Sequence, residues 1–274
     1  MSPLYRRIGT MTIALGFDPR RTWRTLRFLL GYIRDAWKWR QCAKQASGPH
    51  FAFHWVPTLA ERNANSGVAS GHYFHQDLWA ARHIYQRAPL RHLDVGSRID
   101  GFVAHLLAFR TVEVVDIRAL DSRIPGLSFQ QADLMAAMPP SIRPAESVSC
   151  LHALEHFGLG RYGDPLAPDG WQTGLRNLCS LVADDGLLYV GVPIGRPAVE
   201  FNAQRIFDPR YIVDEACQHG MKLLAFAHVD DAGDLHEQPS GPLDAHLAHL
   251  AQSSQLDYGC GLYLFHRQVS VSTP

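Results

Sequence analysis

After Pro89 the chain alternates between short apolar runs and stretches with helical spacing. The apolar runs predict strands at residues 91–95, 111–117, 127–132, 147–152, 187–193, 221–228 and 260–266. The helical stretches predict helices at residues 101–109, 171–183 and 209–219. Gly186 and Gly220 follow the last two helices, where a C-cap glycine is expected. This alternation predicts a mostly parallel sheet with helices on both faces.

The final strand is expected to differ from the others. The connection from about 229 to 258 is long, contains Pro and Gly, and is at most briefly helical. We therefore expect a closing antiparallel strand. The predicted fold class is α/β: a Rossmann-like three-layer sandwich with a mostly parallel seven-stranded sheet, a C-terminal antiparallel strand and an N-terminal helical arm.

The N-terminal arm contains a basic amphipathic helix. Its apolar positions step by three and four, and its basic residues lie mostly off that stripe. Two interpretations stay open, a helix on an anionic membrane surface through residues 20–44 and a helix docked on its own or a partner's core. The stripe consists of Trp23, Leu26, Leu30, Ile33 and Trp37.

Three segments follow from these patterns. Residues 1–49 form the basic arm, and residues 50–72, rich in Gly, Ser, Asn and Pro, form a linker or a lid. A helical pattern returns from Tyr73 to Gln86, and the α/β domain is expected over residues 73–270.

Charge is distributed unevenly along a chain whose formal net charge is zero. Residues 1–49 carry ten basic residues against two acidic ones, which leaves sixteen basic against twenty-four acidic in the rest. This asymmetry argues against a nucleic-acid-binding core and suggests that the arm meets something anionic.

The cysteines and the early residues bear on the compartment. Five scattered cysteines without a C-x-x-C pair fit reduced thiols. We see no signal peptide and no run long enough to span a membrane. The expected location is cytoplasmic, and the membrane interpretation of the arm would place the protein at a membrane surface.

The segment DVGSRIDGFVAH, residues 94–105, has the pattern of a strand, a glycine turn and a helix start. Asp94 ends the strand, Gly96 permits a sharp turn, and Gly101 opens the helix. Asp116 ends the next strand, where an acidic residue is placed to hold ribose hydroxyls. A dinucleotide cradle is disfavoured because Arg98 and its neighbours replace the later glycines of G-x-G-x-x-G.

The segment SCLHALEHFGLGRYGDP, residues 149–165, follows the fourth strand, where an open α/β sheet binds its substrate. His156 is the preferred general base, and Glu155 is expected to orient it or to bind substrate. His152 is a substrate-side candidate or a buried core histidine. The remaining substrate-binding candidates are Arg161, Tyr162, Asp164, Asn202 and Arg205, the last of which suits a phosphate or carboxylate.

Residues 71–267 resemble the class I methyltransferase superfamily, with Asp94-Val95-Gly96 as its first motif and Asp116 as its second. The runs DVGSRIDGFVAH, SCLHALEHFGLGRYGDP, VPIG and FN resemble, more closely, an uncharacterised domain-of-unknown-function family associated with glycan-related genes. The resemblance implies S-adenosylmethionine as cofactor and methyl transfer to a small polar or carbohydrate acceptor in glycan biosynthesis.

The resemblance also implies which residues hold the cofactor: Asp94, Gly96, Ser97, Arg98, Gly101, Asp116 and Asp133. Asp133 would lie near the adenine amine. Arg98 and Asp100 replace small residues of the first motif, so they either pair with the cofactor's amino-acid end or fill the pocket.

Two alternatives follow from the same residues. The irregular first motif suggests a non-catalytic fold that serves as a binding or scaffold subunit in glycan assembly. His152, Glu155 and His156 spell H-x-x-E-H, a zinc-hydrolase signature, which requires both histidines on one helical face. Because Phe157-Gly158-Leu159-Gly160 is a poor helix, no metal ligand is expected.

Overall fold

In the computed structural model, the described residues are 13, 15–16, 18–59, 65–121, 123–237, 247, 250 and 256–268. The chain divides into two compact units, Met1–Val68 and Ala69–Pro274. Each unit is described separately.

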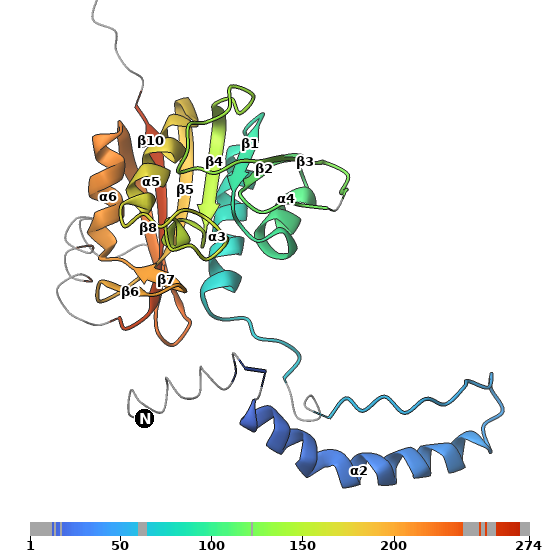
Figure 1. Ribbon diagram of the computed structural model, residues 1–274. Coiled ribbons are helices and arrows are strands. Elements are labelled where there is room, and N and C mark those ends of the chain that lie inside the picture. The colour runs from blue at the N-terminus through green and yellow to red at the C-terminus, as the bar shows by residue number, and fades with distance from the viewer. Residues whose placement is uncertain are drawn as a thin grey trace, which may run out of the picture. The chain divides into compact units, whose positions relative to one another are not determined.

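The larger unit is built on an eight-stranded sheet with the order β3-β2-β1-β4-β5-β10-β8-β9 (Figure 1). The pairs from β3 to β5 are parallel, and β10 runs antiparallel between β5 and β8. The predicted mostly parallel sheet with a C-terminal antiparallel strand is confirmed; the eighth strand is the two-residue β9. The strands are β1 (His92–Val95), β2 (Val112–Asp116), β3 (Leu127–Gln131), β4 (Ala145–Leu151), β5 (Val182–Ile194), β8 (Met221–Val229), β9 (Leu235–His236) and β10 (Gly259–Arg267).

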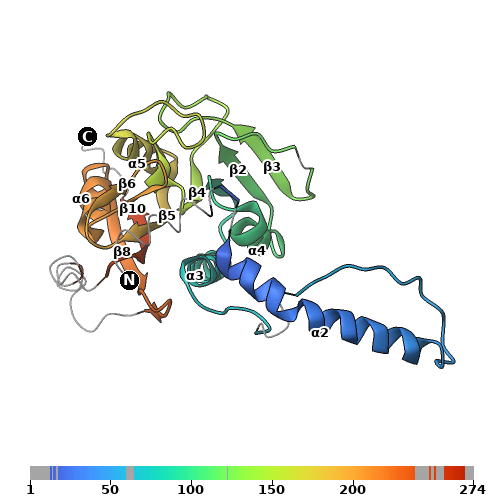
Figure 2. The same ribbon diagram turned by 60° about the horizontal axis from the view of Figure 1, so that its bottom comes forward.

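Helices cover both faces of this sheet (Figures 1 and 2). On one face lie α5 (Gly170–Ser180) and α6 (Pro209–Gln218), whose Leu175, Leu178 and Ile212 join one apolar cluster. On the other face lie α3 (His72–Arg87) and α4 (Ala104–Leu107), whose Trp79 and Leu106 join a second cluster. The three-layer arrangement follows from two apolar faces of one sheet.

Some boundaries differ from the prediction. The helix expected at 101–109 begins as a π-helical turn, Ile99–Val103, before α4. Gly220 follows α6 with φ +78°, as expected for a C-cap. Gly186 is not a cap: it lies inside β5, which already pairs with β4 at Val182. A Cβ at Gly186 would lie 2.7 Å from the Ala183 carbonyl oxygen, so the irregular start of β5 requires glycine.

A short hairpin was not predicted. β6 (Ala198–Glu200) and β7 (Gln204–Ile206) pair antiparallel after the turn that ends β5. Strands of three residues are too short to produce a visible alternation in sequence. This hairpin brings Ala203 and Arg205 to the loop that follows β4.

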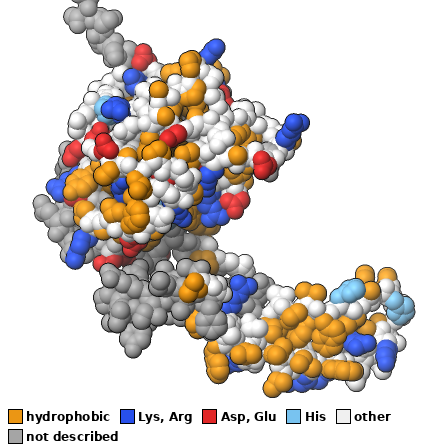
Figure 3. Space-filling model, in the orientation of Figure 1, with side chains coloured by type: hydrophobic (Ala, Val, Ile, Leu, Met, Phe, Trp, Pro, Cys, Tyr) orange, Lys and Arg blue, Asp and Glu red, His pale blue; other side chains and the backbone are white. Residues whose placement is uncertain are grey.

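The smaller unit contains α2 (Pro19–Ala43), the predicted amphipathic helix. Tyr32 and Trp39 contact Trp55 and Phe53, so part of the predicted linker or lid packs on this helix. Apolar side chains gather along another face of α2 (Figure 3). Among the described residues no helix combines the length and apolarity needed to cross a membrane.

Candidate active site

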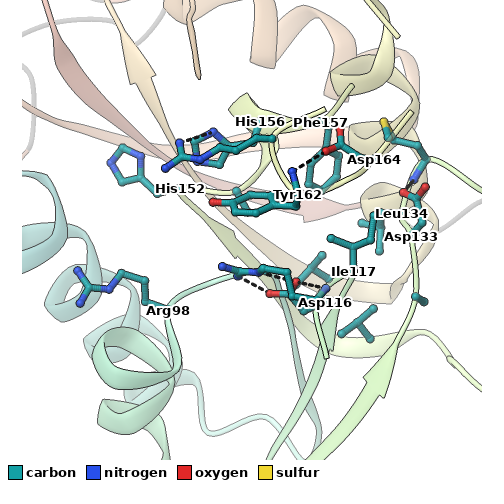
Figure 4. A pocket seen from close by; sticks show the side chains of 18 of the residues that line it. Arg98, Asp116, Ile117, Asp133, Leu134, His152, His156, Phe157, Tyr162 and Asp164 are labelled. Atoms are coloured by element: carbon teal, nitrogen blue, oxygen red, sulfur yellow. Dashed lines mark hydrogen bonds and ion pairs between the residues drawn. The ribbon is translucent and has the colours of Figure 1, made fainter. Parts of the chain in front are cut away.

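A pocket of about 250 Å³ opens at the carboxyl ends of β1, β2 and β4 (Figure 4). This is the crevice at the point where the strand order reverses between β1 and β4, where open α/β sheets bind ligands. Nine predicted site residues line it: Gly96, Arg98, Asp116, Asp133, His152, His156, Arg161, Tyr162 and Asp164. Its lining does not include six others: Asp94, Ser97, Gly101, Glu155, Asn202 and Arg205.

Asp94 holds the turn that follows β1 through buried hydrogen bonds. Its carboxylate accepts hydrogen bonds from the Ser97 backbone N–H at 3.1 Å, the Ser97 hydroxyl at 2.6 Å and the Ser149 hydroxyl at 2.6 Å. Ser97 Oγ also accepts from the Leu151 N–H at 3.0 Å, which ties the turn to β4. Complete burial raises the pKa of Asp94 to about 6, and the two serines lower it in part. Asp94 and Ser97 therefore shape the pocket without facing it.

The two glycines of this turn allow close approaches. Gly96 has φ +71°, and a Cβ there would lie 2.8 Å from the Ala153 Cβ at the end of β4. A Cβ at Gly101 would lie 2.7 Å from Asp77 Oδ2 on α3. Glycine is thus needed at position 96 for both conformation and space, whereas a side chain at position 101 would require Asp77 to move.

Asp116 is already paired. Its Oδ1 accepts from the Arg118 backbone N–H at 2.8 Å and from Arg118 Nε at 3.0 Å, and its Oδ2 accepts from the same guanidinium. The Arg118 guanidinium also lies 4.7 Å from the centre of the Tyr162 ring. Sequence reasoning missed Arg118, although an arginine two residues after a strand-end carboxylate was a usable signal.

One end of the pocket is apolar. Ile117, Leu134 and Met135 line it beside Asp133. Asp133 Oδ1 accepts from the Met135 backbone N–H at 2.8 Å, so this carboxylate also holds its own loop. These apolar lining residues were not among the predicted site residues, because buried loop residues carry no distinctive sequence pattern.

Arg98 and Tyr73 form another wall. The Arg98 guanidinium lies 4.9 Å from the centre of the Tyr73 ring and donates to the exposed Asp100 carboxylate at 2.9 and 3.1 Å. Tyr73, on α3, was not predicted as a site residue. The pairing shows that Arg98 is directed along the pocket wall while Asp100 stays at the surface.

His156 is held in one tautomer. Its Nδ1 lies 2.7 Å from the Ala203 carbonyl oxygen, and since a carbonyl only accepts, Nδ1 carries the proton and Nε2 the lone pair. Burial lowers the pKa of His156, and nearby Arg161 lowers it further. A neutral imidazole with a free Nε2 is the form that a general base requires.

Glu155 lies between two histidines but is closer to His152. Its Oε1 is 2.6 Å from His152 Nδ1 and 3.8 Å from His156 Nε2, and the Glu155 side chain is 1% exposed. The predicted orienting contact to His156 is therefore longer than a hydrogen bond. His152 has φ +51°, and only Leu154–His156 is helical, as a 3-10 turn. The H-x-x-E-H segment does not form the helical face that the zinc-hydrolase signature requires.

Asp164 fixes the glycine-rich loop over the pocket. Its carboxylate accepts from the backbone N–H groups of Gly158, Gly160 and Tyr162 at 2.9 to 3.1 Å. The Tyr162 ring lies between the guanidinium groups of Arg118 and Arg161, at 4.7 and 5.4 Å. Tyr162 is therefore held in the pocket wall by the charges on either side.

Arg205 supports the loop from outside the pocket. It is 6% exposed, and its guanidinium donates to the carbonyl oxygens of Glu155, Phe157, Ala167 and Pro168. The Arg205 N–H groups are hydrogen-bonded to backbone carbonyl oxygens, whereas the sequence predicted that they would bind a phosphate or carboxylate. Asn202, at the exposed tip of the β6–β7 hairpin, is also outside the lining.

Comparisons with known proteins give the following. A family model described as "Caenorhabditis protein of unknown function, DUF268" matches residues 127–225. No curated protein matches the chain. Among solved structures the chain is similar to the [4+2]-cyclase SpnF, with a TM-score of 0.48, 13% identity and coverage of 70% of this chain and 81% of that one.

Two methyltransferase structures are also similar. The N-methyltransferase NodS from Bradyrhizobium japonicum WM9, in complex with S-adenosylhomocysteine, has a TM-score of 0.46 at 11% identity and covers 72% of this chain and 88% of its own. The 1,6-didemethyltoxoflavin-N1-methyltransferase of Burkholderia thailandensis has a TM-score of 0.46 at 14% identity and covers 72% and 84%.

Proposed function

We propose that the chain is an S-adenosylmethionine-dependent methyltransferase that acts on an oxygen of a small polar or carbohydrate acceptor. One observation carries the proposal: a single pocket at the strand ends holds Asp116 and Asp133 together with His156, whose Nε2 is free to accept a proton. The carbohydrate class of the acceptor rests on the family resemblance of the sequence, since nothing in the pocket selects a sugar.

Separate regions of the pocket match the separate parts of S-adenosylmethionine. In this proposal Asp116 would hold the ribose hydroxyls, and the apolar end formed by Ile117 and Leu134 would receive the adenine ring beside Asp133. Arg98 offers a cation to the carboxylate of the amino-acid end. When bound, the cofactor supplies a methyl group activated by a sulfonium.

The chain's own contribution is positioning and proton removal. The Ala203 carbonyl and the Arg161 side chain, which donates to it at 2.7 Å, fix the His156 ring so that Nε2 remains the acceptor. His156 then takes the proton of the acceptor hydroxyl, and the Tyr162 ring closes the wall beside it.

Calorimetric titration with S-adenosylmethionine and S-adenosylhomocysteine tests the cofactor. We expect binding that Asp116→Ala weakens at least tenfold, because a carboxylate with two acceptor oxygens is lost. Asp184→Ala is the matched control, since this carboxylate is 68% exposed and lies outside the pocket lining. No binding by a folded wild-type protein would refute the proposal.

His156→Asn tests the base separately. It should lower turnover of an identified acceptor about a hundredfold or more and leave cofactor affinity unchanged. Equal loss of both would assign His156 a structural role.

A non-catalytic binding or scaffold role is the second candidate. The observation that favours it is that Asp116, the carboxylate proposed to hold the ribose, is already occupied. Arg118 donates hydrogen bonds to both of its oxygens, and the Tyr162 ring packs on the Arg118 guanidinium. If neither cofactor form stabilises the wild-type protein against heat, this candidate moves ahead.

A further inference from the structure

A cluster of potential metal ligands lies beside the pocket and is not used by the proposed function. His72 at the start of α3, His152 after β4 and Cys260 on β10 each offer a ligand atom, and these atoms lie within 4.8 Å of one another. Among the described residues this is the only such group of three or more. Three segments far apart in the sequence supply it.

His152 presents an unused nitrogen to this cluster. Its Nδ1 is bound to Glu155 Oε1 at 2.6 Å, so Nε2 is the nitrogen that it can offer. Nε2 is buried without a hydrogen bond to a nitrogen or oxygen of the described residues; the imidazole interacts with the Cys260 thiol, and the side chain is 4% exposed. A buried nitrogen without such a hydrogen bond costs free energy unless something binds it, which indicates a missing ligand.

His72 is also held in one tautomer. Its Nε2 lies 3.2 Å from the Tyr258 carbonyl oxygen, and because that oxygen only accepts, Nε2 carries the proton. The lone pair is therefore on Nδ1. In metal-binding histidines, the ring nitrogen that does not bind the metal typically donates its N–H to a carboxylate or a backbone carbonyl. His152 has the Glu155 carboxylate in this place, and His72 has the Tyr258 carbonyl.

Cys260 completes the donor set with a soft ligand. It is a free, fully buried thiol that interacts with the His152 imidazole, and its Sγ lies 4.0 Å from Gln76 Oε1 and 3.8 Å from the Gly261 carbonyl oxygen. One thiolate with two imidazoles is a donor set that zinc prefers over magnesium or calcium.

We propose that His72, His152 and Cys260 bind a zinc-type divalent ion, with Glu155 and the Tyr258 carbonyl orienting the two imidazoles. On binding, the S–H bond of Cys260 breaks, a metal–sulfur bond forms, and the proton goes to solvent. The ligand atoms lie within 4.8 Å of one another, and the His72 and His152 rings are nearly parallel, with centroids 5.2 Å apart and an interplanar angle of 5°. To give zinc bonds of about 2.0 to 2.3 Å, the ligand atoms must approach one another by about 1 Å and the rings must turn so that both lone pairs point at the ion. This site differs from the H-x-x-E-H set, of which it uses only His152, and from the expectation of no metal.

The ion would clamp the start of α3 to the sheet. Tyr73, adjacent to His72, lines the pocket under the Arg98 guanidinium, and His152 lines the pocket as well. Three protein ligands leave a fourth position for water. Zinc binding should therefore raise the thermal stability of the protein.

Cobalt binding to the untagged, chelator-treated full-length protein tests the proposal. We expect a thiolate-to-cobalt charge-transfer band that saturates at about one equivalent and is displaced by zinc. Cys260→Ser should abolish the band, and Cys179→Ser, which removes another buried thiol, should retain it. Absence of the band in the wild type, or its persistence in Cys260→Ser, would overturn the proposal.

Glu155→Gln provides a second variant that keeps all three ligands. It should weaken zinc affinity about ten- to a hundredfold in a competition assay with a chromophoric chelator. An unchanged affinity would argue against the site. Titration of S-adenosylhomocysteine into the metal-free protein is a separate readout, so failure of the metal site and failure of the methyltransferase proposal are distinguishable.

Discussion

The side chain of Asp116 shows what a sequence reveals at the scale of one residue and what it does not. Its position at the end of the second strand was predictable from the apolar run before it. Its pairing with Arg118 depends on a turn that bends the chain back, and no periodicity reports such a turn. The cofactor must therefore share this carboxylate with Arg118 or displace the arginine.

Arg118→Ala should strengthen binding of S-adenosylhomocysteine. Removing the guanidinium frees acceptor sites on Asp116 worth about 0.5 to 1.5 kcal/mol per hydrogen bond, which corresponds to roughly two- to tenfold in affinity. Calorimetry measures it, with Arg123→Ala as a control outside the pocket lining. Weaker binding would instead make Arg118 a cofactor contact.

Gly96 makes a second residue-level prediction. Gly96→Ala should lower the free energy of unfolding by about 2 to 5 kcal/mol, because it combines an unfavourable φ with a contact to the Ala153 Cβ. Gly220→Ala has a similar φ of +78° but no atom within 4 Å, so it should cost only about 1 to 2 kcal/mol. Urea denaturation compares the two; equal losses would show that the turn relaxes around the added methyl.

His92 should make the fold sensitive to acid. Complete burial lowers its pKa from 6.5 to about 3, while Ser147 and Ser149 bond its two ring nitrogens. Between pH 6.5 and 3, His92 is therefore protonated in the unfolded chain and neutral in the folded chain. The free energy of unfolding falls as the pH drops through this range. Asp94 acts oppositely: its raised pKa, about 6, adds stability on acidification below that value.

His92→Gln separates the two effects. The variant lacks the titrating ring. Between pH 6.5 and 4 it should therefore lose less unfolding free energy than the wild type, by a few kcal/mol, because the contribution of His92 changes by about 1.4 kcal/mol per pH unit. Thermal unfolding at several pH values measures the difference. Parallel pH profiles for the two proteins would contradict the assignment.

At the scale of elements, α2 has one packed face and one exposed apolar face. Tyr32 and Trp39 pack on Trp55 and Phe53, whereas the predicted stripe stays exposed: Trp23 by 69%, Leu26 by 58% and Leu30 by 80%. The stripe was predictable from spacing. The aromatic contacts were not, because residues 51–59 form neither helix nor strand and show no period.

The exposed stripe of α2 should bind an anionic bilayer. Apolar side chains enter the interface while the helix's basic residues meet the headgroups. We expect the full-length protein to float with vesicles containing phosphatidylserine and not with neutral ones. Trp23→Ser with Leu30→Ser should reduce flotation about tenfold, whereas Leu90→Ser with Leu224→Ser, exposed elsewhere, should not. If the wild type stays unbound, the membrane interpretation of this face is wrong.

At the scale of the whole molecule, local patterns predicted the sheet better than the site. All seven predicted strands are present. Most are buried and carry the apolar runs that buried strands need, whereas the edge strand β3 has no buried residue. The strand-end pocket followed from that topology. Tertiary contacts had no sequence signal, as with the carbonyl oxygens around Arg205 and the meeting of His72 with Cys260.

The place of β10 in the sheet has a consequence for biosynthesis. This strand pairs with β5 on one side and β8 on the other, yet it leaves the ribosome after all the other strands among the described residues. Some 65 residues separate the end of β5 from β10, so at roughly 5 to 20 residues per second the nascent chain holds an unpaired β5 edge for about 3 to 13 s. Throughout that interval the half-built sheet presents a template for other nascent strands, and premature termination before Gly259 would make that exposure permanent.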